Sequence, residues 1–112
     1  MKTLNILIII STLFFISCEK IDNDAPDCIK KLIRNKAGLN LCETGAFVNL
    51  YSFQGENVYV FDPGRCGADM SAPVYDENCE KLGELGGFAG NTKINDVEFS
   101  GVAVLIKTIW KD

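Results

Sequence analysis

The stretch that decides the fold is residues 47–61, which read FVNLYSFQGENVYVF. It contains two runs rich in β-branched and aromatic residues, 47–53 and 58–61, joined by a polar connection that includes Gly55. Two such runs with a short glycine-containing connection predict a β-hairpin. Because side chains alternate between the two faces of a strand, we expect one face to be buried. Aromatic residues dominate one face, which makes them the core candidates: Phe47, Tyr51, Phe53, Tyr59 and Phe61. The alternative is that the small sheet buries the other face.

Segments on both sides of the hairpin extend this prediction. Before it, apolar residues at helical spacing predict a helix from residue 28 to about residue 36; they are Cys28, Ile29, Leu32 and Ile33. After it, Val74 and Tyr75 predict a short strand. The apolar run at residues 102–106 is compatible with a strand or a helix, and its β-branching favours a strand. Trp110 is expected to close the core against the hairpin.

The predicted fold class is α+β. An N-terminal helix packs on a small antiparallel sheet of about four strands, and disulfides hold the structure together. Residues 28–112 are expected to form a single domain, because a chain of 112 residues builds one core. A core of this size leaves little surplus stability, so covalent crosslinks are expected.

The chain contains five cysteines, an odd number that cannot all pair with one another. If Cys18 is set aside, four disulfide candidates remain: Cys28, Cys42, Cys66 and Cys79. Four cysteines permit three pairings. We favour Cys28 with Cys42 and Cys66 with Cys79, because both bonds close short local loops. A zinc site is the competing use, but the chain has no CxxC pair and no histidine.

The N-terminus has the features of a secretory signal peptide, predicted here as residues 1–17. Lys2 supplies the positive start, and the uncharged apolar stretch at residues 4–16 is shorter than the roughly 20 residues that a spanning helix needs. The sequence FISC at residues 15–18 resembles the lipobox of bacterial lipoproteins, which implies that Cys18 is lipidated. Residues 18–27 are then an acidic tether. The alternative is an ordinary secretory signal with an incidental cysteine at its end.

Composition limits the chemistry that the chain can perform. The absence of histidine excludes Ser-His-Asp and Cys-His nucleophile systems. The net charge of −4 argues against binding to nucleic acid, which clusters of Lys and Arg hold. Five carboxylates lie in the loop-rich centre: Asp62, Asp69, Asp76, Glu77 and Glu80. A pair of them could act as acid and base or bind calcium, but solvated loop carboxylates are the simpler interpretation. We predict no cofactor and no metal site.

Several motifs together carry a resemblance to a known group of proteins. They are Cys28-Ile29 at the start of a helix, VNLYSFQGENVYVF at 48–61, CGAD at 66–69, VYDENC at 74–79, LGGFAGN at 85–91 and TIWKD at 108–112. This combination resembles small lipoproteins of Bacteroidota that carry a domain of unknown function. The resemblance implies an outer-membrane location, facing the periplasm or the cell surface, and brings no activity. Members carry a CC pair and a later cysteine near the glycines, where this chain has Cys66-Gly67 and Gly83, so no disulfide map is carried over.

The expected role is that of a non-catalytic binding or accessory module of the cell envelope. Its expected partners are the membrane, through the N-terminal lipid, and an envelope protein. The alternative is that the protein inhibits an extracellular hydrolase. It would bind through residues 65–78, from Arg65 to Asn78, as a rigid loop, and a preorganised loop loses less entropy on binding. An enzyme built on the central carboxylates is the remaining hypothesis.

Overall fold

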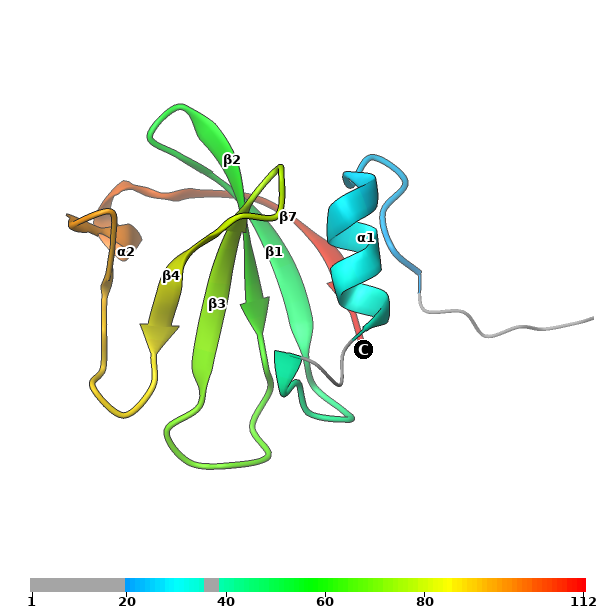
Figure 1. The fold of residues 1–112 in the computed structure, drawn as a ribbon, viewed down its shortest axis with the longest axis horizontal. Coiled ribbons are helices and arrows are strands. Elements are labelled where there is room, and N and C mark those ends of the chain that lie inside the picture. The colour runs from blue at the N-terminus through cyan, green and yellow to red at the C-terminus, as the bar shows by residue number, and fades with distance from the viewer. Residues whose placement is uncertain (1–19, 36–38) are drawn as a thin grey trace, which may run out of the picture.

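The computed structural model describes residues 20–35 and 39–112. The predicted signal peptide, residues 1–17, and the predicted lipidation site, Cys18, lie outside these residues. Figure 1 shows the arrangement of the elements. In chain order they are α1 (Asp27–Arg34), β1 (Phe47–Phe53), β2 (Glu56–Asp62), β3 (Ser71–Asp76), β4 (Lys81–Gly86), β5 (Lys93–Ile94), β6 (Val97–Glu98), α2 (Phe99–Val102) and β7 (Val104–Lys111).

The main sheet has five strands in the order β4-β3-β2-β1-β7, and all of its pairs are antiparallel. The predicted hairpin is confirmed as β1 and β2, with Phe53 opposite Glu56. Its two turn residues, Gln54 and Gly55, have φ values of 54° and 80°. Positive φ at both positions gives a two-residue turn whose twist matches that of the two strands. The expected count of about four strands was too low. Residues 104–111 add β7 to the outer side of β1, and β5 and β6 form a separate two-stranded sheet.

Two separate apolar clusters bury the two faces of the sheet. Each cluster lies toward a different end of the strands. On one face α1 places Ile29 and Ile33 on a first cluster of strand residues: Val48, Leu50, Tyr59, Phe61, Ile109 and Trp110. On the other face the second cluster contains Phe53, Val58, Val74, Ile94 and Phe99. Trp110 is buried opposite Val48, as expected.

The prediction that one face carries all five aromatic core candidates was therefore wrong. Phe53, Tyr59 and Phe61 are buried, whereas Phe47 and Tyr51 are only half-buried. The two-residue turn places Tyr59 opposite Leu50 and Phe61 opposite Val48. Residues that are directly opposite in an antiparallel pair share a face. Tyr59 and Phe61 thus lie on the face away from Phe53, and the second cluster buries Phe53 instead.

Two disulfides connect the four candidate cysteines. They join Cys28 to Cys79 and Cys42 to Cys66, with Cα–Cα distances of 6.1 and 5.7 Å. The favoured local pairing, Cys28 with Cys42 and Cys66 with Cys79, is wrong. Burial of Ile29 and Ile33 sets α1 on the sheet so that Cys28 lies at the turn between β3 and β4, where Cys79 is located. Side-chain packing, rather than short loop length, determines which sulfur atoms meet.

The described part of the predicted tether contacts the domain. Ala25 is buried in the first cluster, and the backbone N–H of Asp22 donates to the carbonyl oxygen of Ile109 at 2.8 Å. The Lys107 ammonium lies 2.9 Å from a carboxylate oxygen of Asp22 and 3.6 Å from one of Asp24. The folded unit therefore reaches at least to Asp22. Across residues 20–35 and 39–112, no helix has the length and apolar character needed to span a membrane.

Candidate functional site

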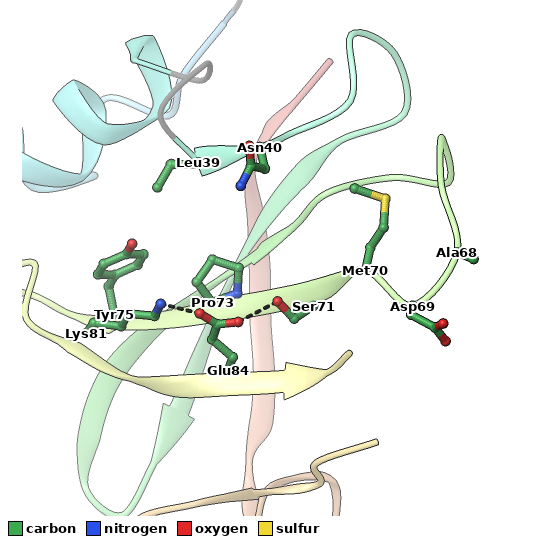
Figure 2. A pocket seen from close by; sticks show the side chains of 10 residues that line it. All are labelled: Leu39, Asn40, Ala68, Asp69, Met70, Ser71, Pro73, Tyr75, Lys81 and Glu84. Carbon is green, nitrogen blue, oxygen red and sulfur yellow. Dashed lines mark hydrogen bonds and ion pairs between the residues drawn. The ribbon is translucent and has the colours of Figure 1, made fainter. Parts of the chain in front are cut away.

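A polar pocket of about 380 Å³ lies where the segment after α1 meets the face of β3 and β4. Figure 2 shows Leu39 and Asn40 on one side, side chains of β3 and β4 on the other, and Ala68, Asp69 and Met70 at one end. Its remaining lining residues are Ser71, Pro73, Tyr75, Lys81 and Glu84. The pocket therefore combines residues 39–40, which precede the sheet, with residues 68–75 and 81–84.

Glu84 is the centre of the polar network in this pocket. It accepts a hydrogen bond from the Ser71 hydroxyl and forms an ion pair with the Lys81 ammonium, as the dashed lines of Figure 2 show. The hydrogen bond from Lys81, and after it the one from Ser71, lowers the pKa of the Glu84 carboxyl below its usual value. The same contact with Glu84 raises the pKa of Lys81. Both side chains are therefore charged at neutral pH.

A β-bulge is what brings Lys81 and Glu84 together. In a regular strand, residues three apart lie on opposite faces. Here Tyr75 is opposite Lys81 and the neighbouring Val74 is opposite Gly83, so Leu82 is the extra residue of β4. One extra residue in a strand shifts the following side chains to the other face. Lys81 and Glu84 consequently point into the same pocket.

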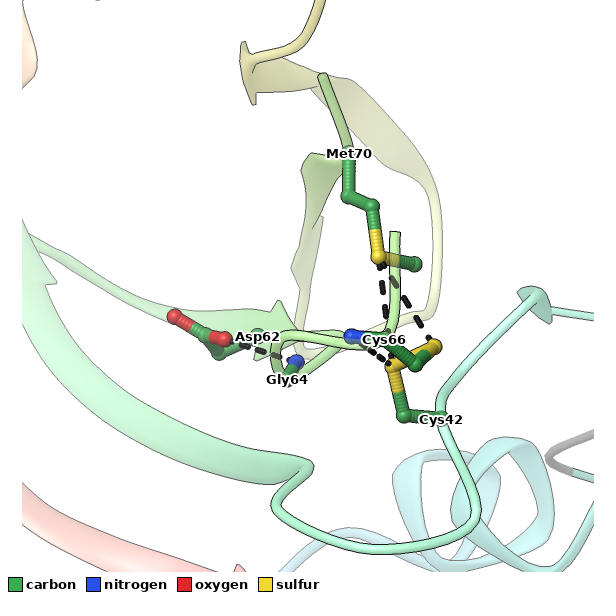
Figure 3. Close-up of a disulfide and its surroundings, with 5 residues drawn as sticks. All are labelled: Cys42, Asp62, Gly64, Cys66 and Met70. Carbon is green, nitrogen blue, oxygen red and sulfur yellow. Dashed lines mark hydrogen bonds between the residues drawn. A yellow bond between two sulfur atoms is a disulfide. The ribbon is translucent and has the colours of Figure 1, made fainter. Parts of the chain in front are cut away.

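The end of the pocket is formed by the loop between β2 and β3, which the Cys42–Cys66 disulfide holds (Figure 3). The backbone N–H of Cys66 donates to Sγ of Cys42 at 3.1 Å, and Sδ of Met70 lies 3.9 Å from both cysteine sulfur atoms. The Cys42 N–H donates to the carbonyl oxygen of Pro63 at 2.9 Å. These contacts fix the loop relative to Asn40 and Leu39.

Gly64 allows the chain to turn at the start of this loop. Its N–H donates to the Asp62 carboxylate at 3.0 Å, and its φ is +91°. A Cβ atom at Gly64 would lie 3.1 Å from Gly45 C and 3.2 Å from Cys42 Cβ. The position therefore needs glycine both for its backbone conformation and for the close approach of the segment that carries Cys42.

The arrangement is suited to binding a polar or charged group rather than to acid–base chemistry. A general base works best with a pKa near the operating pH, but the pKa of Glu84 is lowered. Asp69, Lys81 and Glu84 provide both signs of charge around the space, with the Tyr75 ring and Pro73 as apolar surface. The described part of the chain contains no group of three or more His, Cys, Asp or Glu side chains arranged to hold a metal ion.

The sequence-predicted candidates are distributed unevenly over this site. Of the five central carboxylates, Asp69 lines the pocket. Asp62 and Asp76 accept backbone N–H groups in turns, Asp76 from Asn78 at 2.8 Å and from Glu80 at 2.9 Å. Residues 65–78, expected to act as one loop, are a loop only at their two ends, because Ser71–Asp76 is strand β3. The two disulfides account for Cys28, Cys42, Cys66 and Cys79.

Sequence reasoning missed Ser71, Lys81 and Glu84. Their proximity depends on the bulge in β4 and on the pairing of β3 with β4. Neither feature can be recognised from individual residues of the sequence. Residues 81–85, KLGEL, do not alternate regularly between polar and apolar side chains, so the pattern does not predict a strand there.

Comparison with known proteins places the chain in a family. The family model described as "Domain of unknown function (DUF6970)" matches residues 42–112, which include β1 to β7 and the Cys42–Cys66 disulfide. No curated protein and no solved structure matches the chain. The matched region contains most of the pocket, whereas α1 and the segment before it precede the match. Because the match covers more than half of its residues, the chain belongs to the DUF6970 family.

Proposed function

We propose that the protein is a lipid-anchored envelope protein of the outer membrane whose domain binds a partner without catalysing a reaction. The anchor is the lipid on Cys18, after removal of residues 1–17 as a signal peptide. The FISC sequence and the cysteine count support it, since the four other cysteines are all used in disulfides. The resemblance to lipoproteins of Bacteroidota supports the location, on either the periplasmic side or the cell surface.

The binding role is carried by the pocket beside the disulfide-held loop. Its ion pair of Lys81 and Glu84 is surface-accessible, with side-chain exposures of 47% and 43%. Exposed ion pairs contribute little to folding stability, about 0–1 kcal/mol. Stability alone is therefore a weak explanation for the presence of this polar network. A partner that presents a charged group can exchange contacts with either member of the pair. We propose a protein partner in the envelope, recognised through such a group.

The lipid anchor is tested by the substitution Cys18→Ala. Cells that produce the wild type or the variant are labelled with a radioactive fatty acid, and the protein is recovered from membrane and soluble fractions. We expect label and membrane retention in the wild type and neither label nor maturation in the variant. Equal labelling of the two chains would contradict the proposal.

The binding role is tested by photo-crosslinking in cells. A photoreactive amino acid is placed at Asp69, on the rim of the pocket, or at Asp96, an exposed control residue in another turn that shares its positive φ. We expect an adduct from position 69 and none from position 96. Hydrogen bonds to charged groups contribute about 1.5–3 kcal/mol, so Lys81→Met should reduce the adduct about tenfold or more. Equal adducts from both positions, or no effect of Lys81→Met, would overturn the binding role of the pocket.

The inhibitor alternative retains support from one observation. Five consecutive residues of the disulfide-held loop are exposed: Arg65, Cys66, Gly67, Ala68 and Asp69. An inhibitor would use this loop alone, since the rest of residues 65–78 includes strand β3. The crosslinking experiment distinguishes this alternative. It is favoured if the protein forms an adduct with a hydrolase, and if Arg65→Ala abolishes that adduct while Lys81→Met leaves it in place.

A further inference from the structure

The edge strand β7 exposes a row of apolar side chains at its start, and residues 20–24, which follow the proposed lipidation site, contact the same strand at Thr108 and Ile109. Val104, Leu105 and Ile106 are 63%, 53% and 49% exposed. Val102, just before the strand, is 47% exposed. Residues 99–106, FSGVAVLI, contain no charge. The strand itself carries Lys107 and Lys111 further along. An exposed apolar stretch on an edge strand is an aggregation hazard that proteins normally cover or protect with charges.

The length of the tether determines what lies near this edge. Residues 20–24 line a pocket together with Thr108 and Ile109 of β7, and the N–H of Asp22 is bonded to the carbonyl oxygen of Ile109. A residue spans at most about 3.6 Å of extended chain, so Cys18 is within about 7 Å of Lys20 and within about 14 Å of Asp22. Ile106 is three residues from Ile109, or about 10 Å along the strand. Cys18 therefore lies within about 30 Å of Ile106, a reach that allows the bilayer holding its lipid to contact the apolar row.

We propose that the apolar edge of β7 lies on the surface of the bilayer to which the protein is anchored, with Val104, Leu105 and Ile106 inserted at the headgroup level. This inference rests on the proposed lipidation of Cys18. At that depth, water remains available to the outward backbone groups of the edge strand, while apolar side chains are transferred to the acyl boundary. The Lys107 ammonium beside the row is paired with Asp22 and Asp24, so its positive charge is neutralised next to the contact.

The irregular backbone of β7 favours a bilayer over a second copy of the chain. The pairing of β7 with β1 shifts register twice, so that Ile106 and Ile109 have no partner residue on β1. Bulges disrupt the regular ladder that a further strand needs, and they are one way in which edge strands avoid pairing. Val104 is opposite Ser52 and Leu105 is opposite Tyr51, so these two side chains project from opposite faces of the edge strand. A lipid surface can receive apolar side chains from both faces of an edge strand and needs no hydrogen-bond register.

The experiment uses the full chain, produced in a host that processes lipoproteins and reconstituted in vesicles of phosphatidylethanolamine and phosphatidylglycerol. Tryptophan is introduced by Leu105→Trp, with Ile106→Trp as a second reporter. Phe88→Trp is the matched control, because Phe88 is an apolar residue that is 89% exposed in the turn after β4, the opposite edge of the sheet. Trp110, which is 2% exposed, gives the same background in all chains.

Acyl chains brominated near the headgroup quench tryptophan that they contact. We expect the added emission of Leu105→Trp and Ile106→Trp to fall by roughly half or more, since interfacial side chains lie about 5–10 Å deep. The added emission of Phe88→Trp should stay unchanged.

Flotation and the mass of the N-terminal peptide report the anchor separately. Protein that floats with an acylated Cys18 but shows no quenching at either reporter overturns the inference alone. Self-association with unquenched reporters assigns the edge to a second copy and also overturns it. Protein without acyl chains that does not float overturns the anchor and the inference together.

Discussion

At the residue scale, Phe53 and Tyr59 lie on opposite faces of one hairpin, and both are almost fully buried, at 2% and 3% exposure. The Phe53 ring packs on Phe99, with ring centroids 4.9 Å apart, while Tyr59 belongs to the cluster beneath α1. Burial also raises the pKa of Tyr59, with the negative charge of Glu77 as a smaller cause. The sheet thus uses both faces of the same two strands to bury apolar surface.

We expect Phe53→Ala to destabilise the whole domain. Replacement of a buried Phe by Ala costs about 3–5 kcal/mol, a large share of the 5–15 kcal/mol typical of a domain. Denaturant unfolding is followed by Trp110 fluorescence, which reports the other cluster, and by circular dichroism. Because β1 and β2 belong to both clusters, the unfolding midpoints from fluorescence and from circular dichroism should decrease by the same amount. The control, Phe88→Ala, should leave them unchanged, and equal midpoints for the two variants would show that Phe53 is not buried.

At the element scale, each disulfide connects a segment outside the sheet to a turn of the sheet. Cys28–Cys79 joins α1 to the turn after β3, and Cys42–Cys66 joins the segment before β1 to the loop after β2. Their sequence separations are 51 and 24 residues. In the chain-entropy model, loops of these lengths correspond to about 4 and about 3.5 kcal/mol. The crosslinks therefore supply stability on the scale of a whole small domain.

The pairing makes a prediction that peptide mapping can check. The variant Cys28→Ser should leave a free thiol at Cys79 and keep the Cys42–Cys66 bond, with a loss of stability of about 4 kcal/mol. Thiol alkylation followed by digestion without reduction identifies the free residue. A free thiol at Cys42 instead would show that the chain forms the local pairing.

At the scale of the whole molecule, the two edges of the sheet have different surroundings. Beside β4, the polar pocket is closed at one end by a disulfide-held loop. The opposite edge, β7, carries the apolar row and the segment that leads to Cys18. In the proposed orientation β7 faces the bilayer, and the pocket beside the other edge points away from it. A partner in the envelope would then have access to Asp69 and Glu84.

The sequence by itself determined the elements whose signals are local. The hairpin followed from alternating β-branched and aromatic residues around a glycine turn, and the helix from the spacing of Ile29 and Ile33. Its predicted end at about residue 36 was slightly late, since α1 ends at Arg34. The burial of Trp110 and the presence of disulfides were also predicted correctly. Each of these depends on side chains that are close in the chain, or on composition.

Only the tertiary structure decided the features that depend on distant segments. The turn register placed Tyr59 and Phe61 on the face away from Phe53, and the packing of α1 brought Cys28 to Cys79. The bulge at Leu82 put Lys81 and Glu84 on one face. A shift of one residue in a strand moves each following side chain to the opposite face. Local patterns therefore define which segments are strands, but pairing between segments decides which side chains meet.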